Sequence, residues 1–201
     1  MAKHGDHLTT GFVGVSYLLP TLTANGQLDT AYKLFLQDTF PSWLFSVKHG
    51  ATTIWERWDG WTPDKGFQNP GMNSFNHYSL GSCGQWMFET VAGISVDPEA
   101  PGFSHFILHP QPGGGLDHAA GTFDSIHGRI ETSWKVEGGK FSLHVVVPVN
   151  TTAMVILPSS QSVQEGGRAI DAAPGIKTFK QDASFSYDIG SGTYDFTCAV
   201  E

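Results

Sequence analysis

The sequence of 201 residues has few cysteines, few basic residues and no long apolar run. Cys83 and Cys198 stand in unlike segments without a C-x-x-C spacing, which argues against a disulfide framework or a zinc site and favours two buried free thiols. Lys and Arg number 11 against 19 Asp and Glu, with a net charge of −8 at pH 7 and no basic block, so neither nucleic acid nor an anionic membrane is expected as a partner. No apolar run approaches the roughly 18 residues of a membrane-spanning helix. With 40% hydrophobic residues, the composition indicates a globular protein with a sizeable core.

The N-terminal stretch MAKHGDHLTT lacks the apolar centre of a secretory signal peptide. A cytoplasmic location is therefore expected for the chain as given. Secretion stays open, because a helix is expected to begin as early as Phe12 and the sequence reads as though it starts inside a larger protein.

The first half of the chain carries helical patterns. Apolar residues recur at helical spacing, Pro41 suits a position near the start of a short helix, and Gly50 and Gly93 suit helix ends. Between the last two expected helices lies a loop, 56–76, rich in Gly, Pro, Asn and Trp. It is longer than most loops in compact domains, which is typical of functional loops. The helices are expected at 12–24, 28–35, within 40–50 and at 77–92.

The second half changes to a period of two. Apolar residues alternate with polar ones before and after Gly138-Gly139, which predicts a hairpin over 130–147. Further strands are expected at 153–157, 185–189 and 194–200. Short strands with Gly-rich turns and no intervening helices are typical of an antiparallel β-sandwich. We therefore expect an α+β chain in two parts, helices over 1–97 and a sandwich over 98–201 that folds alone.

The stretch TTIWERWDGW (52–61) crowds three tryptophans, two acids and one arginine into ten residues, although only 15% of the chain is charged. Sugars offer C–H faces that pack on indole and hydroxyls that bond to carboxylates and guanidinium groups. Hydrolysis of a glycosidic bond also needs carboxyl groups, for which Glu56 and Asp59 are candidates. In the alternative reading, Glu56 and Arg57 form a structural ion pair and the tryptophans are core. The spacing alone leaves both readings open.

Four blocks resemble, in order, the closing part of the bacterial α-L-rhamnosidases, from near residue 7 to the end of the chain. They are HLTTGFVG…YLLPTL…NG, PSWLFSVKHGATTIWERWDGW, MNSFNHYSLGSCGQWMFETVAGI and FILHPQPGGGL…GTFDSIHGRIETSWK. The resemblance implies that residues 1–97 are the last helices of an (α/α)6 barrel, followed by a C-terminal β-sandwich. It also implies cleavage of terminal α-L-rhamnose with inversion, without a metal or cofactor.

The same resemblance assigns residues to the site. Glu56 matches the general base that activates the attacking water, and His77 matches a histidine that contacts the sugar; its alternative is a hydrogen bond to backbone near a helix start. At least one tryptophan is expected to be core, and Asp59 has Arg57 or a loop amide as alternative partners. The substrate-binding candidates are His77, Trp55, Trp58, Trp61, Arg57 and Asp59.

The chain departs from the family pattern at Gly14-Val15-Ser16, where Gly-Thr-Pro is usual. The resemblance also implies that the general acid and most sugar-binding acids lie upstream, so the chain is expected to be an inactive rhamnosidase segment. The expected partners are a rhamnose-containing glycoside and either the upstream barrel segment or a second copy. Self-association would use an exposed apolar patch of Leu18, Leu19, Leu22, Phe35 and Trp86. The alternative function is a non-catalytic carbohydrate-binding or scaffold fragment.

Overall fold

The computed structural model describes residues 5, 7–181 and 184–200. It divides into two compact units, a helical unit, Met1–Trp86, and a sandwich unit, Met87–Glu201. The domain boundary expected after residue 97 falls inside the sandwich unit. That the piece from residue 98 onward folds alone stays a prediction.

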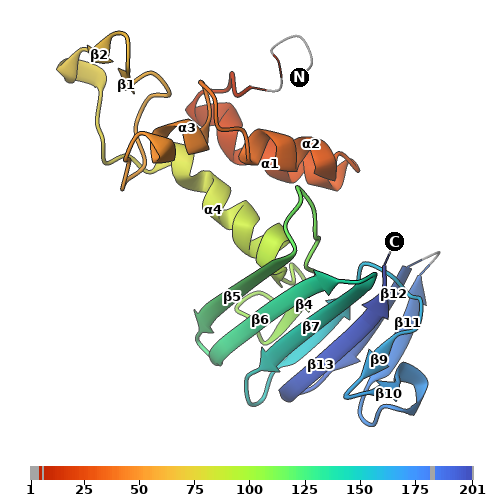
Figure 1. Cartoon of the computed structure of the whole chain (residues 1–201). Coiled ribbons are helices and arrows are strands. Elements are labelled where there is room, and N and C mark those ends of the chain that lie inside the picture. Colours follow the sequence, from red (N-terminus) through yellow and green to blue (C-terminus); the bar gives the residue numbers. More distant parts are fainter. Residues whose placement is uncertain (1–4, 6, 182–183, 201) are drawn as a thin grey trace. The chain divides into compact units, whose positions relative to one another are not determined.

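The helical unit begins with three helices where the periodicity places them (Figure 1). The hydroxyl of Ser42 accepts a hydrogen bond from the Phe45 N–H at 3.0 Å and so caps α3. Gly50, with a φ of +85°, follows the end of α3, as its expected role as a stop requires. The fourth helix begins two residues later than expected, as a 3-10 turn that leads into α-helix. The elements are α1 (Phe12–Ala24), α2 (Leu28–Phe35), α3 (Trp43–Lys48), η3 (Ser79–Ser82) and α4 (Cys83–Trp86).

Aromatic rings fill the core of the helical unit. Trp86 packs edge-on to Tyr32 at 5.1 Å between ring centroids and lies 5.3 Å from Phe35. Its indole N–H donates to the Thr23 hydroxyl at 2.8 Å. The expected exposed patch is therefore wrong: Leu19 and Trp86 are each only 1% exposed, and the other three members are half-buried, because α1, α2 and α4 pack against one another.

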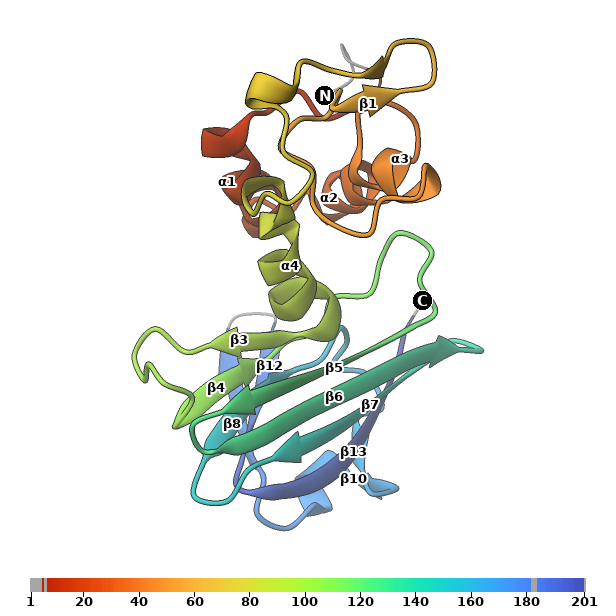
Figure 2. The ribbon, with the colours of Figure 1, turned by 90° about the vertical axis from the view of Figure 1, so that its left-hand side faces the viewer.

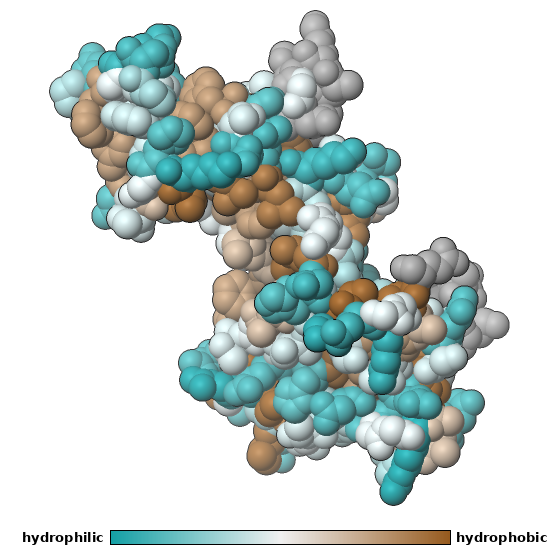
Figure 3. Space-filling model, in the orientation of Figure 1, coloured by the Kyte–Doolittle hydropathy of each residue, from teal (hydrophilic) through white to brown (hydrophobic). Residues whose placement is uncertain are grey.

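Other apolar side chains of the helical unit are exposed instead. Val13 and Tyr78 are 87% and 86% exposed. Hydrophobic surface is visible on this unit in Figure 3, bordered by hydrophilic side chains. The exposed large hydrophobic residues of the unit are Phe12, Val13, Tyr17, Phe40, Val47, Ile54, Phe67, Met72 and Tyr78.

The long loop, here the aromatic loop (56–76), contains a small hairpin of β1 (Trp61–Thr62) and β2 (Gly66–Phe67) and a 3-10 turn, η2 (Pro70–Met72). Its two ends are joined by backbone hydrogen bonds. The Glu56 N–H donates to the Ser74 carbonyl at 2.8 Å, and the His77 N–H donates to the Ile54 carbonyl at 2.9 Å. The loop is thus closed beside Glu56.

The sandwich unit starts with a π-helical turn, η4 (Met87–Ala92), which Gly93 ends with a φ of +81°. A Cβ on Gly93 would lie 2.2 Å from the Pro110 nitrogen, so only glycine fits there. The strands are β3 (Ile94–Val96), β4 (His105–Leu108), β5 (His118–Ser125), β6 (Gly128–Glu137), β7 (Lys140–Val147), β8 (Thr152–Ile156), β9 (Gln164–Glu165), β10 (Arg168–Ala169), β11 (Lys177–Gln181), β12 (Ser184–Ile189) and β13 (Gly192–Ala199), with a 3-10 turn, η5 (Ile170–Ala172).

In the described part of this unit, the strands form a six-stranded sheet, β10-β9-β13-β7-β6-β5, and a five-stranded sheet, β11-β12-β8-β4-β3 (Figures 1 and 2). The predicted sandwich and its hairpin are confirmed, since β6 and β7 meet through Glu137 and Lys140 around the Gly138-Gly139 turn. Among the described strands, the pair β4 and β8 runs parallel, which differs from the expected antiparallel pattern. The large core side chains are Phe106, Trp134, Phe141, Tyr187 and Phe196.

Both cysteines are free thiols, as predicted. Cys198 is buried on β13, whereas Cys83 at the start of α4 is half-buried. Burial raises the pKa of both thiols, which keeps them protonated and unreactive at neutral pH.

Candidate active site around Glu56

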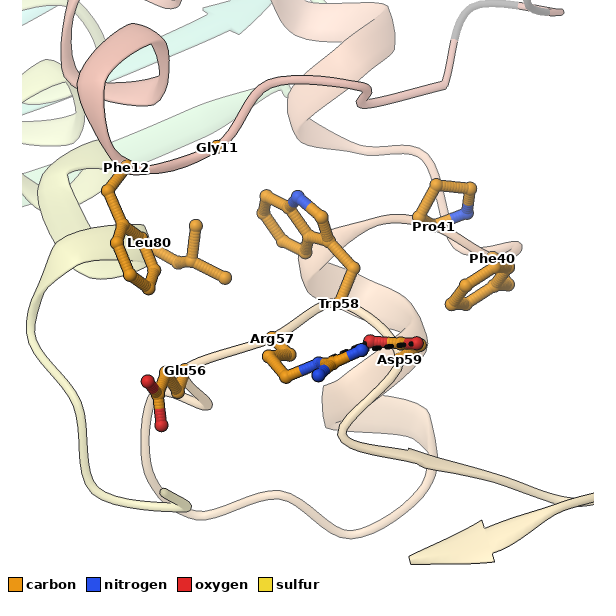
Figure 4. A pocket seen from close by; sticks show the side chains of 9 residues that line it. All are labelled: Gly11, Phe12, Phe40, Pro41, Glu56, Arg57, Trp58, Asp59 and Leu80. Carbon is orange, nitrogen blue, oxygen red and sulfur yellow. Dashed lines mark hydrogen bonds and ion pairs between the residues drawn. The ribbon is translucent and has the colours of Figure 1, made fainter. Parts of the chain in front are cut away.

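Glu56 borders a pocket of about 420 Å³ in the helical unit. Three chain segments supply most of its lining: the start of α1, the turn before α3 and the first residues of the aromatic loop. Figure 4 shows the Glu56 carboxylate at one end of the pocket and the Arg57–Asp59 pair further along it. The lining residues are Gly11, Phe12, Phe40, Pro41, Glu56, Arg57, Trp58, Asp59 and Leu80.

One oxygen of the Glu56 carboxylate is held by the backbone. The Ser74 N–H donates to Oε2 at 2.7 Å, a short bond of the charge-assisted kind. Oε1 accepts no hydrogen bond from the residues that the structure describes, and the side chain is half-buried. The carboxylate therefore has one anchored oxygen and one available to a ligand or water.

Arg57 pairs with Asp59 and not with Glu56. Its Nε and Nη2 donate to the two Asp59 carboxylate oxygens at 2.9 and 3.0 Å, a bidentate pair. The hydrogen bond from Arg57 is the largest cause that lowers the pKa of Asp59, and the same bond raises the pKa of Arg57. The Glu56–Arg57 ion pair considered from the sequence is therefore not formed, whereas the alternative in which Asp59 holds Arg57 is present.

The three tryptophans have different positions. Trp58 lines the pocket, stands edge-on to Trp43 at 5.5 Å and donates its indole N–H to the Thr10 carbonyl at 2.9 Å. Trp55 is 9% exposed, packs edge-on to Phe75 and lines a neighbouring cavity of about 190 Å³, which Trp58 also borders. Trp61 lies on β1 and borders neither cavity. The core reading therefore fits Trp55, and Trp58 has the position expected of a ligand-contacting ring.

His77 does not line the pocket but packs against Phe12, which does. Its imidazole is stacked between Phe12, at 4.8 Å and 16°, and Tyr78, at 5.3 Å and 10°. The Ser79 N–H donates to Nδ1 at 3.3 Å, so in the neutral ring the proton is on Nε2. The backbone hydrogen bond considered as the alternative is thus present, and it leaves Nε2 as a donor.

Sequence reasoning did not identify the apolar wall of the pocket. Phe40, Pro41 and Leu80 come from segments that show only helix and turn patterns, and no pattern indicates that they meet. Ser74 was missed because it acts through its backbone N–H, which any residue other than proline would supply. Within the described part of the chain, no group of three or more His, Cys, Asp or Glu side chains could hold a metal ion, and no helix is long and apolar enough to cross a membrane.

Two family profiles match the chain. Residues 1–91 match the bacterial alpha-L-rhamnosidase 6 hairpin glycosidase domain, and residues 93–169 match the bacterial alpha-L-rhamnosidase C-terminal domain. The chain belongs to the bacterial α-L-rhamnosidase family. The predicted fold class, helices of a six-hairpin glycosidase domain followed by a β-sandwich, is thereby confirmed.

Individual α-L-rhamnosidases are similar over nearly the whole chain. A protein of this name from Streptomyces avermitilis is 44% identical over 95% of the chain, and one from Formosa agariphila is 36% identical over 98%. The crystal structure of the Streptomyces avermitilis α-L-rhamnosidase complexed with L-rhamnose matches with a TM-score of 0.86 at 42% identity over 98% of the chain. The chain spans only 18% and 21% of the length of the first two relatives and 18% of that structure.

Proposed function

We propose that this chain supplies the general base of an inverting α-L-rhamnosidase, and that Glu56 is this base. The observation that supports the proposal is the hydrogen bonding of the two Glu56 carboxylate oxygens. Glu56 lies at an apolar pocket with Oε2 held by the Ser74 N–H at 2.7 Å, while Oε1 has no partner among the described residues. A base needs such an oxygen within hydrogen-bond reach of the water that it deprotonates.

In the proposed reaction, Oε1 of Glu56 takes a proton from a water molecule as its oxygen attacks the anomeric carbon of rhamnose. A second carboxyl group, supplied by another part of the enzyme, protonates the leaving oxygen. Inverting glycosidases place these two groups roughly 6.5–9.5 Å apart, which leaves room for the water.

Sugar recognition is proposed for two other residues. Trp58 offers an aromatic surface on the pocket wall, suited to the C–H face of a sugar. The Nε2–H of His77 can donate to a hydroxyl, because Nδ1 already accepts from Ser79. We place Arg57 and Asp59 at the pocket as a charged pair, and assign Trp55 and Trp61 to supporting packing. The L-rhamnose bound to the Streptomyces avermitilis relative supports rhamnose as the sugar.

The test is a chimeric enzyme, the Streptomyces avermitilis α-L-rhamnosidase with its matching segment replaced by this chain. We expect it to hydrolyse p-nitrophenyl α-L-rhamnoside and, observed by NMR, to release the inverted anomer first. Glu56→Gln keeps the shape but removes the proton acceptor, so turnover should fall by about 10²–10⁴-fold while L-rhamnose still binds. Glu99→Gln, an exposed glutamate of the sandwich unit, is the matched control and should leave turnover unchanged.

Two results would contradict the proposal. Near-normal turnover of Glu56→Gln would remove the base assignment, and release of the retained anomer would exclude inversion. A chimera that binds L-rhamnose, melts cooperatively and shows no turnover would instead favour carbohydrate binding without cleavage.

A further inference from the structure

A contact between Asn73 and Gly60 ties together the two arms of the aromatic loop. The Asn73 Nδ2 donates to the Gly60 carbonyl at 2.9 Å and, at a longer 3.5 Å, to the Gln68 carbonyl. The amide oxygen of Asn73 is buried and accepts no hydrogen bond from the described residues. The side chain is therefore held by its nitrogen and by close packing of its oxygen.

Gly60 forms the other side of this contact. It is buried, and a Cβ at this position would lie 2.8 Å from the Asn73 Oδ1 and 3.3 Å from the Arg57 carbonyl oxygen. Any side chain at position 60 would have to displace Asn73 or the backbone. The contact is thus close-packed and leaves little freedom to either arm of the loop.

The Asn73–Gly60 contact lies directly beside the anchor of Glu56. Asn73 precedes Ser74, and Ser74 makes two hydrogen bonds to Glu56, one from its N–H to the carboxylate and one from its carbonyl to the Glu56 N–H. Asn73 is therefore one peptide bond away from the N–H that anchors Oε2 of Glu56. Gly60, Asn73, Ser74 and Glu56 thus form one connected set of contacts.

We propose that Asn73, together with Gly60, is a positioning residue for the base. Its contact holds the Ser74 peptide so that Oε2 of Glu56 is anchored and Oε1 faces the attacking water. This inference rests on the proposed role of Glu56. A displacement of a catalytic group by about 1 Å can cost roughly 10²-fold in rate, so losing the contact lowers kcat while the binding of the sugar is kept.

The test uses the same chimeric enzyme. In Asn73→Ala and in Gly60→Ala, kcat should fall about 10–100-fold, while KM and the Kd for L-rhamnose change less than about twofold. The kcat of the double variant should not fall below that of the less active single variant. The reason is that Asn73→Ala removes the oxygen with which a Cβ at position 60 would clash. If Asn73→Ala does not give a folded enzyme, Gly60→Ala decides the question, since it perturbs the same contact from the opposite arm.

The loop contains a matched control. The Asn69 Oδ1 accepts from the Gly71 N–H at 2.9 Å, and a Cβ on Gly71 would lie 3.3 Å from that oxygen. Asn69→Ala and Gly71→Ala therefore remove or crowd a similar contact that has no hydrogen bond to Glu56 or Ser74. Both should keep the wild-type kcat.

The possible outcomes separate the two proposals. Wild-type kcat in Asn73→Ala and Gly60→Ala, with Glu56→Gln inactive, would overturn the positioning role and leave the base assignment. An active Glu56→Gln would overturn both. A loss of kcat matched by an equal loss of L-rhamnose binding would show a merely structural role for Asn73 and overturn the positioning inference.

Discussion

Excision of the sandwich should succeed from residue 87 and fail, or give a much weaker domain, from residue 98. Besides the pairing of β3 with β4, the carbonyl groups of residues 90–93 accept four hydrogen bonds from the rest of this unit. The Val91 and Ala92 carbonyls accept from the Trp134 indole at 2.6 Å and the Thr132 hydroxyl at 2.8 Å. The backbone of the same segment accepts from the N–H groups of Gln111 and His109 at 2.9 and 2.8 Å.

The size of the effect follows from these contacts. Each hydrogen bond contributes about 0.5–1.5 kcal/mol net. Val91 and Ile94 are 9% and 3% exposed, and burial of each contributes about 1.5–3 kcal/mol. These contacts alone contribute roughly 5–12 kcal/mol, which is comparable to the whole stability of a typical domain at about 5–15 kcal/mol.

Urea unfolding followed by far-UV circular dichroism measures the difference. The 87–201 piece should show one cooperative transition, and the 98–201 piece a much lower midpoint or none. A 94–201 piece retains β3 but none of the four carbonyl acceptors, and its midpoint should lie between those of the other two pieces. Equal midpoints for 87–201 and 98–201 would refute this reasoning and support the division after residue 97.

Three further predictions follow from single sites. Thr132→Val leaves the Ala92 carbonyl without its 2.8 Å partner and should lower the free energy of unfolding in urea by about 1–3 kcal/mol. Thr122→Val, at an exposed position of β5, is the control and should change it very little. Equal effects of the two substitutions would contradict this explanation. Burial lowers the pKa of His109 in the folded protein, so the unfolded chain binds more protons at this residue. The free energy of unfolding should therefore fall as the pH drops below about 6.5 toward the lowered pKa. Thermal melting at a series of pH values should show a flatter pH dependence in His109→Phe. The 201-residue chain alone should hydrolyse p-nitrophenyl α-L-rhamnoside no faster than buffer, and hydrolysis that disappears in Glu56→Gln would show that an acid within this sequence suffices.

Local patterns in the sequence predicted most individual elements. The spacing of apolar residues gave α1 and α2, and the Gly138-Gly139 turn gave the β6–β7 hairpin, because each depends on neighbours along the chain. The parallel pairing of β4 with β8 joins residues more than forty positions apart, such as His105 and Thr152. Periodicity identifies which face of an element is apolar but not which faces meet, and this also explains why Leu19 and Trp86 were wrongly expected to be exposed.

The site shows the same limit in its chemistry. Glu56 and Asp59 are equivalent candidates in the sequence, both carboxylates within WERWD, and their surroundings separate them. Asp59 is bound bidentately by Arg57, which lowers its pKa. A general acid at neutral pH needs a raised pKa, so Asp59 is not suited to protonate a leaving group. If Glu56 has the proposed role of base, its complementary acid is a carboxyl group kept protonated by burial or by another negative charge. Asp59 meets neither condition, because its side chain is 43% exposed and its partner is the Arg57 cation.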